Sequence, residues 1–151
     1  MADTGRKVGG EDMLIGGSKH TIDAKGRMFF PARFRDDMWE NITVCRGVDK
    51  CLMLYTPEEW AAFSRRIKEQ PFSVSRPLQH YFFSTAAVCS VDAQGRLLLP
   101  QQLRDFAGLQ KDVWVVGVQD RVEIWDIDEW EKAQNALTND DVKQLMDRIG
   151  F

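Results

Sequence analysis

Two copies of one short charged motif stand in the chain, Asp23-Ala-Lys-Gly-Arg27 and Asp92-Ala-Gln-Gly-Arg96. In each copy the aspartate can accept hydrogen bonds from N–H groups of its own turn, and Gly26 or Gly95 can adopt the positive φ that a tight turn needs. The arginine follows the turn directly, and arginine on a two-stranded ribbon can form a bidentate pair with guanine O6 and N7 in the major groove of DNA. Alternatively, the motif does no more than brace a turn with an exposed ion pair, which is a common arrangement.

The first copy of the motif and the residues after it carry most of the cations. Arg27 is the strongest candidate for base recognition, and Lys25 suits a phosphate or a base edge. Arg33 and Arg35, at the expected start of a short helix, could hold the DNA backbone and set the register of the protein on it.

The second copy departs from the first at the positions that carry charge. Arg96 repeats Arg27, but Gln94 replaces Lys25 and Gln102 replaces a further arginine. We therefore expect this copy to contribute less to the affinity for DNA. Gln94 could add polar contacts to bases, or the second copy could serve mainly in assembly, and the sequence leaves both interpretations open.

The charge of the whole chain opposes DNA binding, whereas its distribution does not. The net charge is −3 and the pI about 5.4, although affinity for DNA comes largely from Lys and Arg that neutralise phosphates. Residues 18–35 hold five cations and one anion, while residues 126–151 hold seven anions and three cations. A single basic hairpin makes few phosphate contacts, so useful affinity would need several copies bound at once in a closed oligomer.

The motif belongs to a longer internal repeat. Residues 23–36 and 92–105 are identical at seven of fourteen positions, and residues 51–60 resemble residues 121–130. Both units should contain a hairpin around the glycine turn, a short helix after a proline, a strand pair and a helix that begins in a capping pattern. The expected hairpins are 20–22 with 27–30 and 88–91 with 96–99, the short helices 31–38 and 100–107 with Gly108 as a stop, and the strand pairs 42–45 with 52–55 and 113–116 with 122–125. Longer helices are expected at 57–68, after Asp126, around 77–83 and at 140–149.

These elements predict an α+β fold, either one compact domain or two very small halves that share a core. A unit with four short strands has little core and leaves hairpin edges open, so the two halves should interdigitate. We assign residues 1–12 to a flexible extension, with Met13 as an alternative start, residues 13–83 to the first repeat with a linking helix, and residues 84–151 to the second repeat with a C-terminal helix.

Residues 20–35, together with residues 92–100, closely resemble the bacterial MraZ proteins, and both D-x-x-x-R motifs are present. The resemblance extends from about Met13 to the C-terminus. It implies membership of the AbrB/SpoVT swapped-hairpin superfamily, with two AbrB-like β-barrel units that form a pseudo-dimer of two-fold symmetry within one chain. It also implies a ring-forming homo-oligomer that regulates transcription by binding repeated promoter boxes of the cell-division and cell-wall gene cluster.

An enzyme is the first alternative function. His20, His80 and Cys89 could do chemistry, but the sequence has no nucleophile elbow, no metal-ligand spacing and no phosphate loop. We therefore expect no catalysis, no cofactor and no metal. The odd number of cysteines, without a C-x-x-C pair, indicates buried packing residues rather than disulfides or zinc ligands; they are Cys45, Cys51 and Cys89.

The second alternative is an oligomeric protein-interaction or antitoxin-like scaffold without specific DNA readout, whose acidic C-terminal helix engages another protein. Four aromatic residues, Trp39, Phe82, Phe83 and Trp114, could line contacts between subunits, although a place in the core is the more ordinary expectation. No run of about 18 apolar residues is present, so we expect a cytoplasmic, nucleoid-associated protein that does not enter a membrane.

Overall fold

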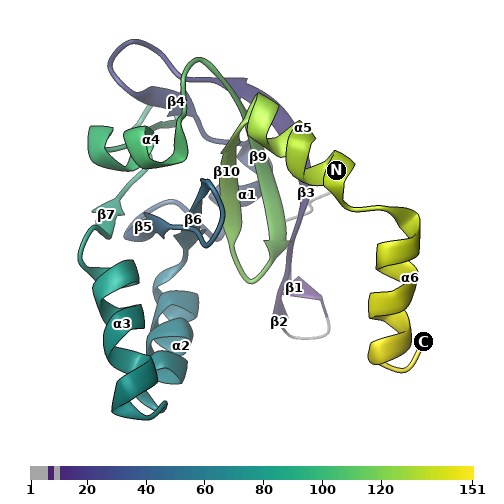
Figure 1. Ribbon diagram of the computed structural model, residues 1–151. Helices are drawn as coiled ribbons and strands as arrows, with labels where there is room; N and C mark the ends of the chain where they lie inside the picture. Colours follow the sequence, from purple (N-terminus) through teal and green to yellow (C-terminus); the bar gives the residue numbers. More distant parts are fainter. Residues whose placement is uncertain (1–6, 9–10) are drawn as a thin grey trace.

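The computed structural model describes residues 7–8 and 11–151 (Figure 1). Its strands are β1 (Lys7–Val8), β2 (Glu11–Asp12), β3 (Leu14–Thr21), β4 (Arg27–Phe29), β5 (Ile42–Arg46), β6 (Cys51–Tyr55), β7 (Ala87–Cys89), β8 (Arg96–Leu98), β9 (Asp112–Gln119) and β10 (Val122–Asp126). Its helices are α1 (Ala32–Arg35), α2 (Pro57–Lys68), α3 (Phe72–Phe83), α4 (Gln101–Ala107), α5 (Ile127–Ala136) and α6 (Asn139–Arg148). The protein is thus of the expected α+β class.

A six-stranded antiparallel sheet, ordered β3-β9-β10-β6-β5-β7, is built from both repeats. The predicted strand pairs are confirmed as β5 with β6 and β9 with β10. The two pairs meet in the centre of the sheet, where β10 lies against β6 with Ile124 opposite Leu52. Neither repeat therefore completes this sheet alone, as the small core of each unit led us to expect.

The expected hairpins around the two glycine turns are confirmed only next to the turns, where Asp23 N and Asp92 N donate to the Arg27 and Arg96 carbonyls and Val91 forms an antiparallel bridge with Leu97. Strand β3 runs into the first turn but pairs along its length with β9, and β7 pairs with β5. The strands after the turns, β4 and β8, pair with each other across the repeats, with Met28 opposite Leu97. The reason is burial: both of these side chains are enclosed when the two short strands lie together.

The predicted helix bounds are confirmed where a capping residue marks the start of the helix. Helix α2 has the expected bounds, with Thr56 Oγ1 accepting from Glu59 N, and α4 ends at Gly108 with φ of 65°. Helix α1 is shorter than predicted. Helix α3 begins at Phe72 instead of Pro77, because Pro71 caps it and Pro77 is tolerated inside the helix.

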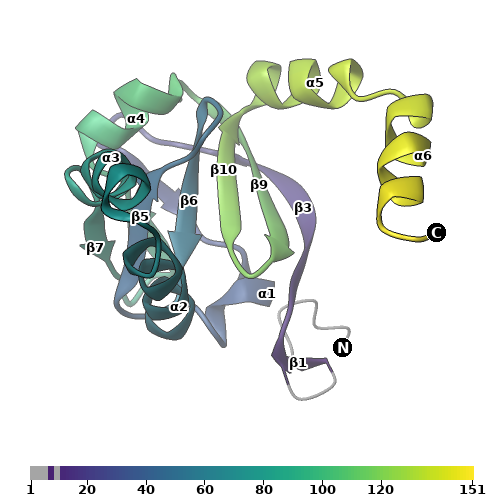
Figure 2. The ribbon, with the colours of Figure 1, turned by 60° about the horizontal axis from the view of Figure 1, so that its bottom comes forward.

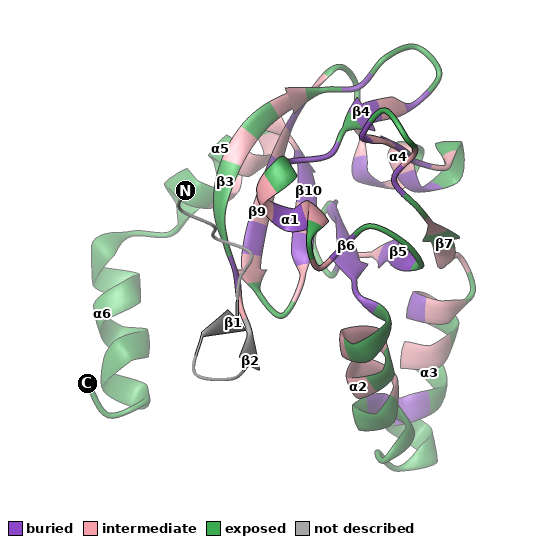
Figure 3. Ribbon diagram, turned by 180° about the vertical axis from the view of Figure 1, so that it is seen from behind, coloured by how far each residue is buried: buried purple, intermediate pink, exposed green. Residues whose placement is uncertain are grey.

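The main core lies between the sheet and the segments that follow the two turns. Phe30, Phe34 and Leu99 are fully buried there, together with strand residues such as Val115 and Leu54. A second, aromatic cluster joins β5 and β6 to the α2–α3 hairpin and contains Tyr55, Trp60, Phe63, Phe82 and Phe83. Figure 3 shows the buried segments gathered in the body of the molecule, whereas the far ends of α2 and α3 are exposed.

The aromatic residues that could have lined subunit contacts lie mainly in the core. Phe82 is buried, Phe83 packs on Trp60, and Trp114 stacks on Trp130 with ring centroids 5.9 Å apart. Only Trp39 among these candidates counts as exposed.

The cysteines pack as expected. Cys45 and Cys51 are buried, Cys89 is half-buried, and all three are free thiols. Burial raises the pKa of Cys45 and of Cys51 to about 12, so neither is a reactive thiolate at neutral pH.

Strands β1 and β2 and helix α6 lie apart from the body (Figure 1). Strands β1 and β2 form a separate antiparallel pair, while the rest of the predicted flexible extension lies outside the described residues. At the other end, α5 crosses to one side and α6 projects away from the sheet (Figure 2). In the described part of the chain, no helix is long and apolar enough to cross a membrane.

Candidate nucleic-acid interface

The first motif forms a turn organised by one carboxylate. Asp23 Oδ1 accepts hydrogen bonds from the backbone N–H groups of Lys25 and Arg27, both at 2.9 Å, and Oδ2 accepts from Arg27 Nε at 2.8 Å. Gly26, with φ of 88°, donates its N–H to the Asp23 carbonyl. The aspartate therefore orients the arginine and the turn at once.

The second motif repeats this arrangement. Asp92 Oδ1 accepts from Gln94 N at 2.9 Å and Arg96 N at 2.8 Å, while Oδ2 accepts from Arg96 Nε at 3.0 Å. Gly95 has φ of 84°. Bracing by an ion pair is thus real in both copies, and it leaves the terminal Nη groups of both arginines without a partner among the described residues.

The two turns are locked to each other through their glycines. Phe30 N donates to the Gly95 carbonyl and Leu99 N to the Gly26 carbonyl, each at 2.9 Å. The Arg104 guanidinium lies against Gly26, so that a Cβ added there would be 2.6 Å from Arg104 Cζ. The backbone contacts between the two turns are therefore reciprocal.

Arg35 takes the equivalent place on the other turn. Its Nε donates to the Phe30 carbonyl at 2.8 Å, its Nη2 donates to the Gly95 carbonyl at 3.4 Å, and Arg104 Nε correspondingly donates to the Leu99 carbonyl at 2.9 Å. Arg35, which the sequence indicated as a DNA contact, therefore holds the ribbon together. Whether it also touches DNA stays a prediction.

The outer face of the β4–β8 ribbon combines charge with exposed apolar surface. Arg27 lies opposite Leu98 and Phe29 opposite Arg96, and side chains two apart on a strand share a face. Phe29 is 60% exposed and Leu98 54%. Sequence reasoning missed both residues, although the alternation in Arg27-Met-Phe29 and Arg96-Leu-Leu98 contained the signal.

Two hollows adjoin this face. One, of about 280 Å³, is lined by Asp23, Arg27, Phe29, Arg96 and Lys111 among others. The other, of about 390 Å³, is lined by Lys19, His20, Thr21, Phe29 and Asp112. Lys111 is a third residue that the sequence reasoning did not single out, because it lies outside both motifs.

The remaining predicted DNA-binding residues differ in how far they are exposed to solvent. Lys25 and Gln94 are exposed at the tips of their turns. Arg33 is half-buried, donates from Nη2 to Ser18 Oγ at 2.9 Å, and lies over the Phe34 ring, so it is less free to reach a phosphate.

Within residues 7–8 and 11–151, no group of three or more His, Cys, Asp or Glu side chains could hold a metal ion.

Comparison with known proteins gives a consistent result. Residues 13–76 and 82–149 both match the family model described as "MraZ protein, putative antitoxin-like". A protein of Caldicellulosiruptor saccharolyticus, named transcriptional regulator MraZ, is 39% identical over 92% of this chain and 100% of its own length. Proteins of the same name from Desulforamulus reducens and Acetivibrio thermocellus are each 43% identical, over 91% and 92% of this chain and 97% and 100% of their own lengths.

The chain belongs to the MraZ family. Each of the two matched regions contains one glycine turn and the ribbon strand that follows it. The interlocked turns therefore join the two family-matched halves of this MraZ chain.

Acid should weaken the two turns of this MraZ chain. Backbone hydrogen bonds from Arg27 and Arg96 are the main cause that lowers the pKa of Asp23 and of Asp92, respectively, below the ordinary value of 3.8. A lowered carboxyl pKa in the folded state stabilises the protein above the unfolded-state pKa, and this contribution is lost as the pH falls through the folded-state value. The free energy of unfolding should therefore fall below about pH 4.

Urea unfolding at a series of pH values from 6 to 3 measures this effect. The variant Asp23→Asn/Asp92→Asn keeps an oxygen that can accept from the turn but cannot titrate, so its free energy of unfolding should depend less on pH in this range. Parallel curves for the variant and the wild type would contradict the assignment.

Proposed function

We propose that this chain is a sequence-specific DNA-binding regulator of transcription, and that the outer face of the β4–β8 ribbon is its reading surface. The proposal rests mainly on one observation: two arginines, each oriented by an aspartate, lie with exposed apolar side chains on one two-stranded ribbon. Such a ribbon fits the major groove. The names of the relatives as transcriptional regulators support the same conclusion.

Arg27 performs the central step of recognition in this proposal. Asp23 holds its Nε, so the side chain has little freedom to lose when its terminal Nη groups, which have no partner among the described residues, pair with guanine O6 and N7. Phe29 and Leu98 can contact thymine methyl groups, which are the apolar features of the major groove. Lys25 contacts a phosphate or a base edge.

The second turn contributes less in this scheme. Arg96 is oriented like Arg27, but Gln94 adds no charge beside it, and Gln94 instead offers a polar contact to a base. Arg33 and Arg35 are already engaged in hydrogen bonds within the chain, so their share in holding the DNA backbone is smaller than the sequence indicated.

The interlocked turns support a place in the AbrB/SpoVT swapped-hairpin superfamily, with residues 13–83 and 84–151 as the two exchanging units. The acidic pI and the small basic face together require several copies on one DNA molecule. We therefore propose a homo-oligomeric ring, associated with the nucleoid, that binds repeated promoter boxes of the division and cell-wall gene cluster.

A binding titration tests the proposal. DNA from upstream of the protein's own gene cluster is compared with scrambled DNA of equal length over a series of salt concentrations. Specific DNA should bind about 10³-fold or more tightly than scrambled DNA, and both affinities should fall as salt rises. Equal affinity for the two DNAs would overturn sequence-specific recognition.

Multivalent binding predicts a further result. DNA with several boxes should bind about 10² to 10⁴ times more tightly than DNA with one box, because the later contacts form at high effective concentration. The control changes the spacing between boxes at constant composition. If affinity does not depend on the number of boxes, the ring has no part in binding.

A protein-interaction scaffold remains the second candidate, because the acidic α5 and α6 present a large exposed surface. It predicts that regulation survives the loss of Arg27, which the DNA-reading proposal forbids.

A further inference from the structure

Helix α6 presents an apolar face that nothing in the described part of the chain covers. Every described residue of the helix is exposed, yet Val142, Leu145, Met146 and Ile149 follow one another at the spacing of a single helix face. They line a shallow hollow of about 510 Å³. In Figures 1, 2 and 3 the helix projects away from the sheet in every view.

An isolated helix of this length needs a partner. Ten residues are too few for a stable helix in water, and the capping box of Thr138 and Asp141 supports only the first turn. The helix carries three anions against two cations, and residues 126–151 as a whole have a net charge of −4. This negative charge disfavours DNA and anionic lipid, because amphipathic helices that bind membranes are rich in Lys and Arg. The partner is therefore a protein surface, both apolar and basic.

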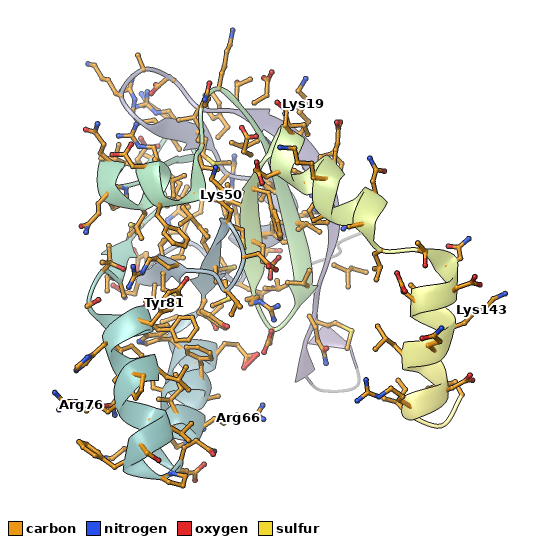
Figure 4. All side chains as sticks on the ribbon, viewed as in Figure 1. Lys19, Lys50, Arg66, Arg76, Tyr81 and Lys143 are labelled. Atoms are coloured by element: carbon orange, nitrogen blue, oxygen red, sulfur yellow. The ribbon has the colours of Figure 1, made fainter. Side chains whose placement is uncertain are left out.

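The chain itself has such a surface at the far end of the α2–α3 hairpin. Phe72 is 70% exposed there, and Val74 is exposed beside it. The surrounding residues 65–76 hold four cations, Arg65, Arg66, Lys68 and Arg76, against Glu69 alone. Among the described residues none of these four cations forms an ion pair, and Figure 4 shows Arg66 and Arg76 directed outward from the hairpin. This tip, defined as residues 65–76, complements the net charge of −4 on residues 126–151.

The two surfaces do not meet within one chain. The hairpin tip and α6 extend from different sides of the body in every view (Figures 1, 2 and 3). We propose that α6 of one copy docks on the hairpin tip of the next copy. This contact is head-to-tail, and repetition of it closes a ring or extends a filament. The inference rests on the proposed ring and names the surfaces that would form it.

The contact also suits the proposed reading face. Strand β4 lies at the opposite end of the molecule from the hairpin tip and from the C-terminal end of α6 (Figure 1). Head-to-tail docking would therefore leave the ribbons of all copies free for DNA.

Two variants each disrupt one of the two surfaces of the proposed contact. The helix variant Leu145→Glu/Ile149→Glu removes the apolar face, and the tip variant Phe72→Glu/Val74→Glu removes its receptor; all four side chains are exposed, so the core is untouched. Light scattering or native mass spectrometry, without DNA, should give oligomers for the wild type and the single-chain mass of 17.4 kDa for each variant. Val48→Glu, at an exposed apolar residue outside both surfaces, should keep the wild-type mass.

Mixing the variants is the decisive step. The helix variant keeps an intact tip and the tip variant keeps an intact helix, so an equimolar mixture should form one-to-one dimers and nothing larger. A monomeric wild type, a variant with wild-type mass, or a mixture that stays monomeric overturns the proposal.

Charge reversal provides an independent readout. Arg66→Glu/Arg76→Glu should weaken assembly about tenfold or more at low salt, and the difference from wild type should shrink as salt rises. An unchanged assembly midpoint would count against the tip as the receptor. Binding of a single DNA box is measured separately, so failure of the docking proposal leaves the assignment of Arg27 intact.

Discussion

Replacing Arg27 with alanine should lower the affinity for one promoter box by about 10- to 100-fold, because a bidentate arginine–guanine pair contributes about 1–3 kcal/mol of discrimination. The loss should compound on DNA with several boxes, where each bound copy loses the same contact. Scrambled DNA should lose far less affinity, because phosphate contacts through Lys25 and neighbouring cations remain. The measurement is a titration with cognate and scrambled DNA at the same salt concentration.

Three controls distinguish DNA reading from bracing of the turn. Arg27→Ala should change the free energy of unfolding only slightly, because its ion pair with Asp23 lies at the surface, where the two side chains are 33% and 42% exposed. Arg96→Ala removes the equivalent ion pair and should cost less DNA affinity, since the second turn has one cation fewer. Phe29→Ala should reduce the preference for thymine at its contact position without changing the salt dependence. Equal binding of cognate DNA by wild type and Arg27→Ala would contradict the reading role.

The sequence predicted those elements whose signals are local. Thr56 and Asp126 mark helix starts through their own side chains, and Gly108 ends α4 by adopting a positive φ. The strand pairs β5–β6 and β9–β10 are joined by short loops, so neighbours in the sequence became neighbours in the sheet. The glycine turns were predicted with the correct role for their aspartates.

The pairing of β4 with β8 could not be read from the sequence. Each strand has three residues, and the apolar pattern fits a local partner as well as a distant one. What decides between them is the burial of Met28 and Leu97 in a core that both repeats supply. The role of Arg35 was hidden for the same reason, because its acceptor at Gly95 belongs to the other repeat.

The interlock of the turns makes Gly26 the most sensitive position of the site. An alanine Cβ at Gly26 would lie 2.6 Å from Arg104 Cζ, and φ of 88° is unfavourable for any residue but glycine. The backbone strain costs about 1–2 kcal/mol. Displacing Arg104 from the Leu99 carbonyl costs about 1.5–3 kcal/mol more, because a charged donor is lost. Gly26→Ala should therefore lower the free energy of unfolding by about 2.5–5 kcal/mol, and Tm by about 10 °C.

A double-mutant cycle separates the two causes. In an Arg104→Ala background the guanidinium is already absent, so Gly26→Ala should cost only the strain of about 1–2 kcal/mol. Gly108→Ala is the matched control, since it also has a positive φ but its Cβ would meet only the flexible end of Lys50. It should cost about as much as Gly26→Ala costs without Arg104. If Gly26→Ala has the same effect in both backgrounds, the guanidinium does not hold the turn. The contact between the two glycine turns is then stabilised by the backbone hydrogen bonds alone.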